Sequence, residues 1–537
     1  MKRTTAIITV LLIAAQAFAA VRLPSVIGDG MILQRNEPVT VWGWADSGEE
    51  FSVCWDGRCY PVAADRNGEW TLILPSMPAG GPYTMTIGDI VVNDILIGDV
   101  FLCTGQSNME LPVRRVTDMF ADEIASYTNT RIRQYIVPDT FDFTAPQNDT
   151  PASSWKACTQ DNVMEFSALA YFYAKEIFSR TGVPVGIVNC CWGGTPVEAW
   201  MSEDALKDFP AYINEKRLYE NPDYCKRIKT LEGENFHRWN TALYSGDPGM
   251  QAGTRWYEYD YDDSGWKDVD MFSKDWGNDG FRPSAGSHWL RKDIDIPSGW
   301  AGKEAVLRLG CIVDADSVYV NGHFVGSTGY QYPPRIYRIP AGILKKGKNN
   351  ITVRIISNGG QPRFIPEKPY KIICQGEEIN LEGRWKYSQG APMPPAPSMM
   401  FFCYKPVCLY NAMIHPLKNM EFRAVLWYQG ESNVDRRHEY ADLLTAMIGC
   451  WRETFADAGL PFYIVELADY LHKDDIAGRK AWAEMRQQQA KAAEMNTNAT
   501  LIRNSDLGEW NDIHPLDKKT LGKRAAEATL KDMKITK

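Results

Sequence analysis

The sequence lacks the features of nucleic-acid-binding and membrane-spanning proteins. Its 58 lysine and arginine residues are outnumbered by 67 aspartate and glutamate residues, which gives a formal net charge of −9. No basic cluster stands out, although proteins that bind nucleic acid usually carry one. Beyond the N-terminal segment, no apolar run approaches the length needed to cross a bilayer. We therefore expect neither a nucleic-acid partner nor membrane insertion.

The common metal-binding patterns are also missing. The sequence has only seven histidines, no H-E-x-x-H motif, and no two C-x-x-C motifs at zinc-site spacing. Protein zinc sites are usually built from such patterns. We predict that the protein uses no metal ion and no organic cofactor.

Residues 1–19 have the pattern of a secretory signal peptide. Lys2 and Arg3 precede an apolar run, and an Ala-Phe-Ala cleavage pattern ends at Ala19. A retained membrane anchor is the alternative, but the apolar run is short for a bilayer span. No cysteine follows the cleavage site, which argues against a lipoprotein. We predict export to the periplasm or the extracellular space.

Twelve cysteines are free to pair in an oxidising compartment. In the stretch CWDGRC, an Asp-Gly hairpin turn would place Cys54 opposite Cys59. A cross-strand disulfide is one reading of this pair, and two free thiols are the other. Cys190 and Cys191 are adjacent in an apolar segment, so we predict that both are buried free thiols.

A chain of 537 residues is too long for one hydrophobic core and predicts several domains. Short β-like runs separated by turns predict a small β-sandwich over residues 20–97. Strand–helix–strand order predicts one α/β domain in two halves, residues 98–234 and 395–537. Between them, period-2 alternation and an Asn-Gly hairpin predict an inserted β domain over residues 235–394.

Three apolar segments of the α/β halves end in glycine and polar residues. The three tips are GQSN at 105–108, GGT at 193–195 and QGESN at 429–433. Near-continuous apolar runs are typical of parallel strands, and ligands bind at the carboxyl ends of such strands. Glycine N–H groups and amide side chains are the donors that stabilise an oxyanion. The pattern favours an acyl-transfer site.

Acyl transfer also needs a nucleophile and a general base. Ser107 lies at the first tip. His514 lies in the loop before the last predicted helix, two residues after Asp512. A histidine with a carboxylate nearby suits a general base. We expect Gln106 and Asn108 to fix the loop around Ser107 rather than to take part in catalysis.

Four motifs carry a family resemblance. GQSNM at 105–109, GGTPVEAW at 193–200, LWYQGESN at 426–433 and DIHP at 512–515 follow one another along the chain. With this set the chain resembles the sialate O-acetylesterase-like branch of the SGNH hydrolase family. The resemblance implies a flavodoxin-like, parallel, three-layer α/β domain. It also implies a metal-free serine esterase that acts on carbohydrate acetyl groups.

The predicted insertion resembles the jelly-roll, sugar-binding-like domain of family 2 glycoside hydrolases. This second resemblance is based on Trp266, on RLG at 308–310 and on SVYVNGHFVG at 317–326. It concerns the fold more than any ligand.

The first resemblance implies a role for each matched position. Ser107 matches the nucleophile, and its backbone N–H matches one donor of the oxyanion hole. Gly194 matches the second donor, with its neighbour Gly193 as the other candidate. For the third donor Gln429 is the first choice and Asn433 the second.

His514 matches the general base, but the acid departs from the family pattern. The usual acid precedes the histidine by three residues, and Asn511 stands there. Asp512 lies one position later. Either Asp512 orients His514, or a Ser–His dyad operates with a backbone carbonyl as the orienting group.

Other readings of these residues remain open. Ser107 alone would suit a helix N-cap, because Glu110 three residues later completes a capping box. Glu198 and Glu431 would suit a glycosidase pair, although buried carboxylates that hold the loops are the preferred reading. A glycosidase barrel of repeated βα units is not visible. A carbohydrate-binding protein with a degenerate hydrolase domain is the non-enzyme alternative.

Together these features predict an exported serine esterase that removes O-acetyl groups from carbohydrates. The expected substrates are 9-O-acetyl sialic acids, and acetylxylan or another acetylated polysaccharide is the alternative. The sequence fixes neither the acetylated sugar nor the oligomeric state.

Overall fold

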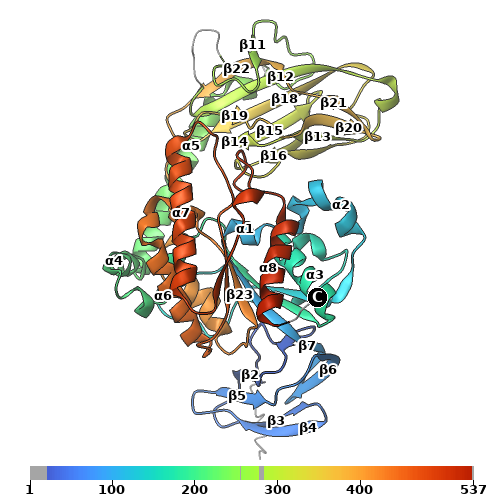
Figure 1. Cartoon of the computed structure of the whole chain (residues 1–537). Coiled ribbons are helices and arrows are strands. Elements are labelled where there is room, and N and C mark those ends of the chain that lie inside the picture. Colours follow the sequence, from blue (N-terminus) through green and yellow to red (C-terminus); the bar gives the residue numbers. More distant parts are fainter. Residues whose placement is uncertain (1–20, 254, 277–282, 535–537) are drawn as a thin grey trace, which may run out of the picture.

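The computed structural model describes residues 21–253, 255–276 and 283–534, so the predicted signal peptide lies outside the described residues. Figure 1 shows three regions along the molecule. A small β region lies at one end, an α/β region with a central sheet lies in the middle, and a second β region lies at the other end. Within the described ranges, no helix is long and apolar enough to cross a membrane.

The central sheet has the strand order β25-β24-β23-β7-β10-β8-β9. Neighbouring strands are parallel from β25 to β8, and only β9 runs antiparallel to its neighbour. Every residue of β10, β23 and β24 is buried, as expected for strands covered on both faces. The strands are β7 (Ile90–Gly105), β8 (Asn129–Ile136), β9 (Trp155–Cys158), β10 (Val185–Cys191), β23 (Ala424–Tyr428), β24 (Phe462–Val465) and β25 (Ala499–Ile502).

Helices flank this sheet on both sides, with α6 and α7 on one side and α3 and α8 on the other (Figure 1). The helix of the expected strand–helix–strand order in the first half is α3, which precedes β10. Ser167 accepts a hydrogen bond from the N–H of Ala170 at its start, and Gly182 ends it in a left-handed conformation. The helices are α1 (Ser107–Glu110), α2 (Thr117–Ala125), α3 (Ala168–Thr181), α4 (Pro210–Tyr219), α5 (Pro222–Gly246), α6 (Tyr440–Thr454), α7 (Ile476–Met495) and α8 (Lys518–Asp532).

The N-terminal β region shares one long strand with the central sheet. The first part of β7 pairs with β6 and β1, and its last part, from Asp99 to Gly105, pairs with β10. The expected boundary between residues 97 and 98 therefore falls inside a continuous strand. The other strands are β1 (Ile32–Gln34), β2 (Val39–Trp44), β3 (Glu50–Trp55), β4 (Arg58–Ala63), β5 (Glu69–Leu74) and β6 (Gly80–Ile87).

The cysteine assignments can be compared directly with the structure. Cys54 and Cys59 face each other across the β3–β4 hairpin and form a disulfide, which confirms the first of the two readings. Cys190 and Cys191 are free and buried, as predicted.

The second β region forms two larger antiparallel sheets with the orders β11-β22-β12-β18-β15-β16 and β17-β13-β20-β21, and a small antiparallel pair, β14-β19. It has its own hydrophobic core, and the predicted Asn-Gly hairpin joins β15 to β16. Its strands are β11 (Lys267–Asp270), β12 (Gly286–Ile296), β13 (Ala305–Leu309), β14 (Ile312–Val313), β15 (Ala315–Val320), β16 (His323–Thr328), β17 (Ile336–Ile339), β18 (Gly347–Ser357), β19 (Arg363–Phe364), β20 (Tyr370–Cys374), β21 (Glu377–Asn380) and β22 (Arg384–Pro392).

The start of this region differs from the sequence-based boundary. Residues 235–246, assigned above to the β insertion, are the C-terminal half of α5. Asn221 caps this helix, and Pro222 occupies its first turn. Only Trp239 and Leu243 are buried along α5, and its sequence is polar overall, unlike the sequences of α3 and α6.

Candidate active site

The three polar tips meet because their strands are neighbours in register. Gly105 at the end of β7 pairs with Cys191 of β10 on one side and Tyr428 of β23 on the other. A side chain at Gly105 is excluded, because a Cβ there would lie 2.1 Å from the carbonyl oxygen of Tyr428. The backbone at Gly105 also has φ = 134°, which favours glycine. The loop that carries Ser107 therefore begins at a close crossing of two strands.

Ser107 follows this crossing and begins α1. Its Oγ lies 2.8 Å from Nε2 of His514, within hydrogen-bond distance. The capping-box reading does not hold, since Gln106 is the N-cap residue and no side chain caps the helix. As the first residue of α1, Ser107 has a backbone N–H without an intrahelical partner. The arrangement brings together the Ser107 hydroxyl, the imidazole of His514 and the backbone N–H of Ser107.

The two residues beside Ser107 fix the loop, as predicted. Gln106 Oε1 accepts hydrogen bonds from the N–H groups of Gly430 and Ser432, at 3.4 and 3.3 Å. Asn108 Nδ2 donates to the carbonyl oxygen of Ile513 at 2.9 Å. Since Ile513 precedes His514, this last bond ties the loop that carries Ser107 to the loop that carries His514.

His514 is only 7% exposed and lies in the loop before α8. The ring of Tyr332, from the second β region, packs edge-on against the imidazole with 5.2 Å between ring centroids. Burial lowers the pKa of His514 to about 3, and the cations Lys518 and Arg115 act in the same direction. The imidazole is therefore neutral at neutral pH and able to accept the proton of Ser107.

Asp512 does not contact the free ring nitrogen of His514. Its Oδ1 lies 4.0 Å from Nδ1 and instead accepts the backbone N–H of His514 at 2.9 Å. Its Oδ2 pairs with Nζ of Lys368 at 3.1 Å. Within the described residues Nδ1 has no hydrogen-bond partner, so neither Asp512 nor a backbone carbonyl orients it. The two oxygens of Asp512 bind the backbone N–H of His514 and the ammonium group of Lys368, which accounts for the distance between the carboxylate and Nδ1.

The two candidate glycines have different surroundings. A Cβ on Gly193 would lie 3.4 Å from Cβ of Ser107, so Gly193 borders the nucleophile directly. A Cβ on Gly194 would lie 2.0 Å from the hydroxyl of Tyr404, and Gly194 has φ = 78°. Gly194 therefore provides the turn and the close packing, while its neighbour is adjacent to the serine.

The carboxyl group of Glu110 lies beside Gly193, where a Cβ would be 3.0 Å from Oε2. Glu110 is an exposed residue. Desolvation of its carboxyl group and the charge of Asp139 raise its pKa to about 7. A carboxyl group therefore lies close to the backbone of this candidate donor.

Gln429 and Asn433 belong to a buried amide network. Gln429 is fully buried, and its Nε2 donates to Oδ1 of Asn433 at 2.7 Å and to the carbonyl oxygen of Thr195 at 3.2 Å. Nδ2 of Asn433 donates to the carboxylate of Glu198 at 2.9 Å. Both amide groups therefore hold the loops together. Gln429 Nε2 uses both of its N–H bonds in this network, and Asn433 Nδ2 uses one of its two.

A second buried group lies behind the nucleophile. Asn108 donates to Oε1 of Glu431 at 2.6 Å and accepts from Nζ of Lys518 at 2.7 Å. Burial raises the pKa of Glu431 to about 6 and lowers that of Lys518 to about 8. Glu431 and Glu198 both hold loop side chains, close to the structural role expected for them, although their partners are amides and cations rather than loop N–H groups.

Sequence reasoning missed the charged and aromatic residues that surround His514. These are Arg115, Tyr332, Lys368 and Lys518. None lies in a recognisable motif, and two of them lie in the second β region, far from the catalytic motifs in sequence. Their positions depend on how the two regions pack. In the described ranges, no group of three or more His, Cys, Asp or Glu residues is placed to hold a metal ion.

Comparison with known proteins places this chain within a family. A family model described as carbohydrate esterase, sialic acid-specific acetylesterase, matches residues 97–234 and 400–531, which is about half of the chain. Sialate O-acetylesterase from Rattus norvegicus is 29% identical over 210 residues, covering 35% of this chain and 38% of the relative. The enzyme of that name from Mus musculus is 22% identical over 484 residues, covering 84% of this chain and 61% of the relative.

The chain thus aligns with less than two thirds of the length of these relatives. Among solved structures, a carbohydrate acetylesterase from Xanthomonas citri matches with a TM-score of 0.56 and 24% identity. The match covers 95% of this chain and 75% of the other, and it shows a shared fold. On the strength of the family match across both halves of the α/β region, this chain belongs to the family of carbohydrate esterases known as sialic acid-specific acetylesterases.

Proposed function

We propose that the protein is a carbohydrate O-acetylesterase with Ser107 as nucleophile and His514 as general base. The observation that carries the proposal is the 2.8 Å contact between Ser107 Oγ and His514 Nε2, at the carboxyl edge of the sheet. Family membership supports the reaction class. A carbohydrate-binding protein with a degenerate hydrolase site would have no reason to keep this contact.

The reaction proceeds in two acyl-transfer steps. His514 Nε2 takes the proton of Ser107 while Oγ attacks the acetyl carbonyl carbon. The tetrahedral intermediate collapses as His514 returns the proton to the departing sugar hydroxyl, which leaves an acetyl group on Ser107. Water then attacks this ester, again with His514 accepting and donating the proton, and acetate is released.

The oxyanion hole combines two backbone donors and one amide. The N–H of Ser107 is the first, and the N–H of Gly193 or Gly194 is the second. Gly193 is favoured as the second donor, because it lies against Ser107. Gln429 remains the proposed third donor with Asn433 as the alternative. Gln429 would have to exchange one hydrogen bond of the buried network for one to substrate, because both of its N–H bonds are engaged.

The site suits more than one acetylated sugar. The relatives named sialate O-acetylesterase favour O-acetyl sialic acids as substrates. The fold shared with a carbohydrate acetylesterase keeps acetylated polysaccharides such as acetylxylan as the alternative. Acetate release from 9-O-acetylated sialic acid on mucin and from acetylated xylan would separate these two possibilities.

We further propose that the α/β region is a three-layer flavodoxin-like domain. If β8 and β9 are counted as edge additions, the remaining order β10-β7-β23-β24-β25 corresponds to the 2-1-3-4-5 order of that fold. The paired antiparallel sheets of the second β region support a jelly-roll insertion. Export is supported by the disulfide between Cys54 and Cys59, since such bonds persist in oxidising compartments.

Replacement of Ser107 tests the proposed function. Ser107→Ala should reduce hydrolysis of an aryl acetate by at least about a thousandfold, as in other serine enzymes that lose the nucleophile. Ser126→Ala is a matched control, because Ser126 is exposed and its hydroxyl donates to the backbone carbonyl of Glu123 in α2. Circular dichroism and the melting temperature should match the wild type in both variants. Full activity of Ser107→Ala would refute the proposal.

A further inference from the structure

The loop that carries His514 packs against the inserted β region. Asn511 Nδ2 donates to the carbonyl oxygen of Pro366 at 2.7 Å, and Trp510 Nε1 donates to the carboxylate of Glu367 at 2.9 Å. These contacts join the catalytic loop, residues 505–517, to the segment around Pro366 and Glu367, which is distant in sequence. The loop is therefore held partly from outside the α/β region.

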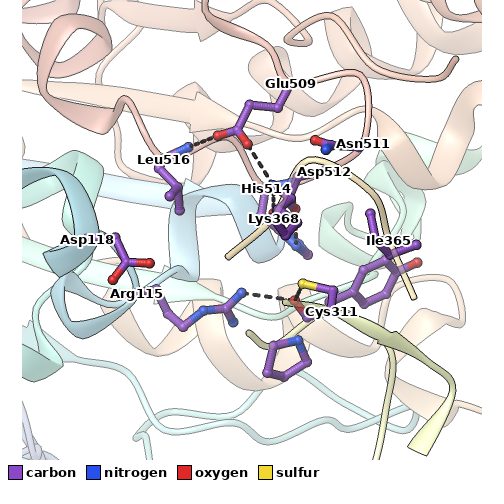
Figure 2. A network of polar contacts seen from close by, with 12 residues as sticks. Arg115, Asp118, Cys311, Ile365, Lys368, Glu509, Asn511, Asp512, His514 and Leu516 are labelled. Atoms are coloured by element: carbon purple, nitrogen blue, oxygen red, sulfur yellow. Dashed lines mark hydrogen bonds and ion pairs between the residues drawn. The ribbon is translucent and has the colours of Figure 1, made fainter. Parts of the chain in front are cut away.

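Lys368, the next residue in that segment, pairs with two carboxylates of the catalytic loop. Its Nζ lies 2.7 Å from Oε2 of Glu509 and 3.1 Å from Oδ2 of Asp512 (Figure 2). The side chains of Lys368 and Asp512 are each 11% exposed. Such partly buried charges are poorly screened by solvent, and removing one of them leaves its partners uncompensated.

The same two carboxylates also hold the backbone on both sides of the imidazole. Oε1 of Glu509 accepts the N–H of Leu516 at 3.0 Å, and Oδ1 of Asp512 accepts the N–H of His514 at 2.9 Å. One oxygen of each carboxylate therefore binds the loop, and the other binds Lys368. The ammonium group fixes the orientation of both.

We propose that Lys368 is a positioning residue of the esterase site, through which the inserted β region holds His514 against Ser107. The proposal rests on the catalytic roles proposed above for Ser107 and His514. Lys368 does not touch the reacting atoms. It acts through Glu509 and Asp512, and it keeps the Asp512 carboxylate turned toward the backbone of His514 rather than toward Nδ1.

Charges around His514 link this arrangement to pH. Lys518 of α8 and Arg115, which follows α1, favour the neutral imidazole, while Tyr332 covers one edge of the ring. Asp512 is the nearby anion, 4.0 Å from Nδ1, and Lys368 compensates its charge. Loss of Lys368 would therefore favour the protonated imidazole and move the acid limb of kcat/KM to higher pH.

The first experiment compares Lys368→Ala with Lys371→Ala in the full chain. Lys371 pairs with Glu378 inside the same β region and contacts nothing in the catalytic loop. Lys368→Ala should lower kcat for an aryl acetate about tenfold with KM within about twofold, because a small displacement of the base slows chemistry more than binding. Lys371→Ala should match the wild type, and Lys368→Arg should recover most of the loss.

The pH profile separates positioning from a general loss of structure. Lys368→Ala should raise the apparent pKa of the acid limb of kcat/KM. In an Asp512→Asn background the same substitution should move that limb less, because the anion nearest Nδ1 is then absent. If Lys368→Ala lowers the melting temperature strongly, Lys368→Met replaces it, since Met preserves the apolar stem. A wild-type kcat and an unmoved acid limb in the folded variant would overturn the proposal.

Hydrogen exchange tests whether Lys368 restrains the loop that carries His514, without relying on catalysis. Amides in residues 505–517 should exchange faster in Lys368→Ala than in the wild type, and Lys371→Ala should leave them unchanged. If Ser107→Ala stayed active while this exchange effect was present, the proposed function would be wrong. The conclusion that Lys368 restrains residues 505–517 would still be supported. Unchanged exchange in folded Lys368→Ala would overturn the positioning role alone.

Discussion

At the scale of single residues, the two nitrogens of His514 have unlike surroundings. Nε2 is bonded to the Ser107 hydroxyl, while Nδ1 lies 4.0 Å from the Asp512 carboxylate without a hydrogen bond. Orientation of the ring comes instead from burial, from the edge-on contact with Tyr332, and from backbone bonds on either side. The geometry favours a Ser–His dyad over a triad.

The dyad predicts a small effect of Asp512→Asn. The amide oxygen still accepts the N–H of His514, and Lys368 keeps its partner Glu509, so only the charge of Asp512 is lost. We expect kcat on an aryl acetate to fall less than tenfold. A triad acid replaced by its amide typically loses about ten-thousandfold, and a loss of that size would restore Asp512 as the orienting acid.

The low pKa of His514 predicts activity that persists into acid. Only the neutral imidazole can act as base, so activity falls as pH drops through the pKa of His514. Burial and nearby cations hold this pKa well below its ordinary 6.5. We expect the acid limb of kcat/KM below pH 6, and Lys518→Met, which removes one cation, should raise it. A wild-type limb at pH 6.5 or above would contradict the expectation.

At the scale of elements, the end of β7 determines where the nucleophile lies. The strand is central, flanked by β10 and β23, and its last residue crosses the carbonyl of Tyr428 closely. Parallel strands bring their carboxyl ends to one edge, so the tips of all three strands meet there. Gly105 permits both the crossing and the turn into α1.

Substitution of Gly105 should therefore destabilise the strand pair. A Cβ in Gly105→Ala would clash with the backbone of β23, so we expect a loss of more than about 2 kcal/mol in the free energy of unfolding. Gly182→Ala is the matched control. Gly182 also has positive φ, but a Cβ there meets nothing within 4 Å, and its replacement should cost about 1 kcal/mol. Equal losses in urea denaturation would contradict this reading.

At the scale of the whole molecule, the three regions are connected by a shared strand and by side-chain contacts between them. β7 belongs to both the N-terminal region and the central sheet. Arg35, just after β1, makes a two-point contact with Asp99 of β7, at 2.8 and 3.1 Å. At the opposite end, the catalytic loop contacts the inserted β region. The candidate site is thus supported from outside the α/β region that bears Ser107 and His514.

The Arg35–Asp99 contact gives a prediction about stability. The Asp99 side chain is fully buried, so Arg35→Ala would leave an unpaired charge in the interior and cost about 3 kcal/mol in the free energy of unfolding. Arg35→Lys should recover part of it, since Lys lacks the planar fork. Arg180→Ala, which breaks a partly exposed pair with Glu176, should change stability by less than about 0.5 kcal/mol. Equal effects would contradict the assignment.

Much of the architecture could be predicted from periodicity and turn chemistry. Buried parallel strands read as apolar runs, α3 and α6 as amphipathic stretches, and the Cys54–Cys59 hairpin as an Asp-Gly turn. The C-terminal half of α5 was not predicted as a helix, because most residues of α5 are not buried; only Trp239 and Leu243 are. Periodicity reports burial, so a mostly solvated helix leaves a weak signal.

The chemical groups of the candidate site can be read from local patterns in the chain: apolar strands that end in glycine, serine and amides, and a histidine on a terminal loop. The atoms that these groups engage follow from the three-dimensional packing. Gln429 and Asn433 bond each other, and Asp512 turns to Lys368 instead of to Nδ1 of His514. Those choices depend on contacts between segments far apart in the chain, and no local pattern encodes such contacts.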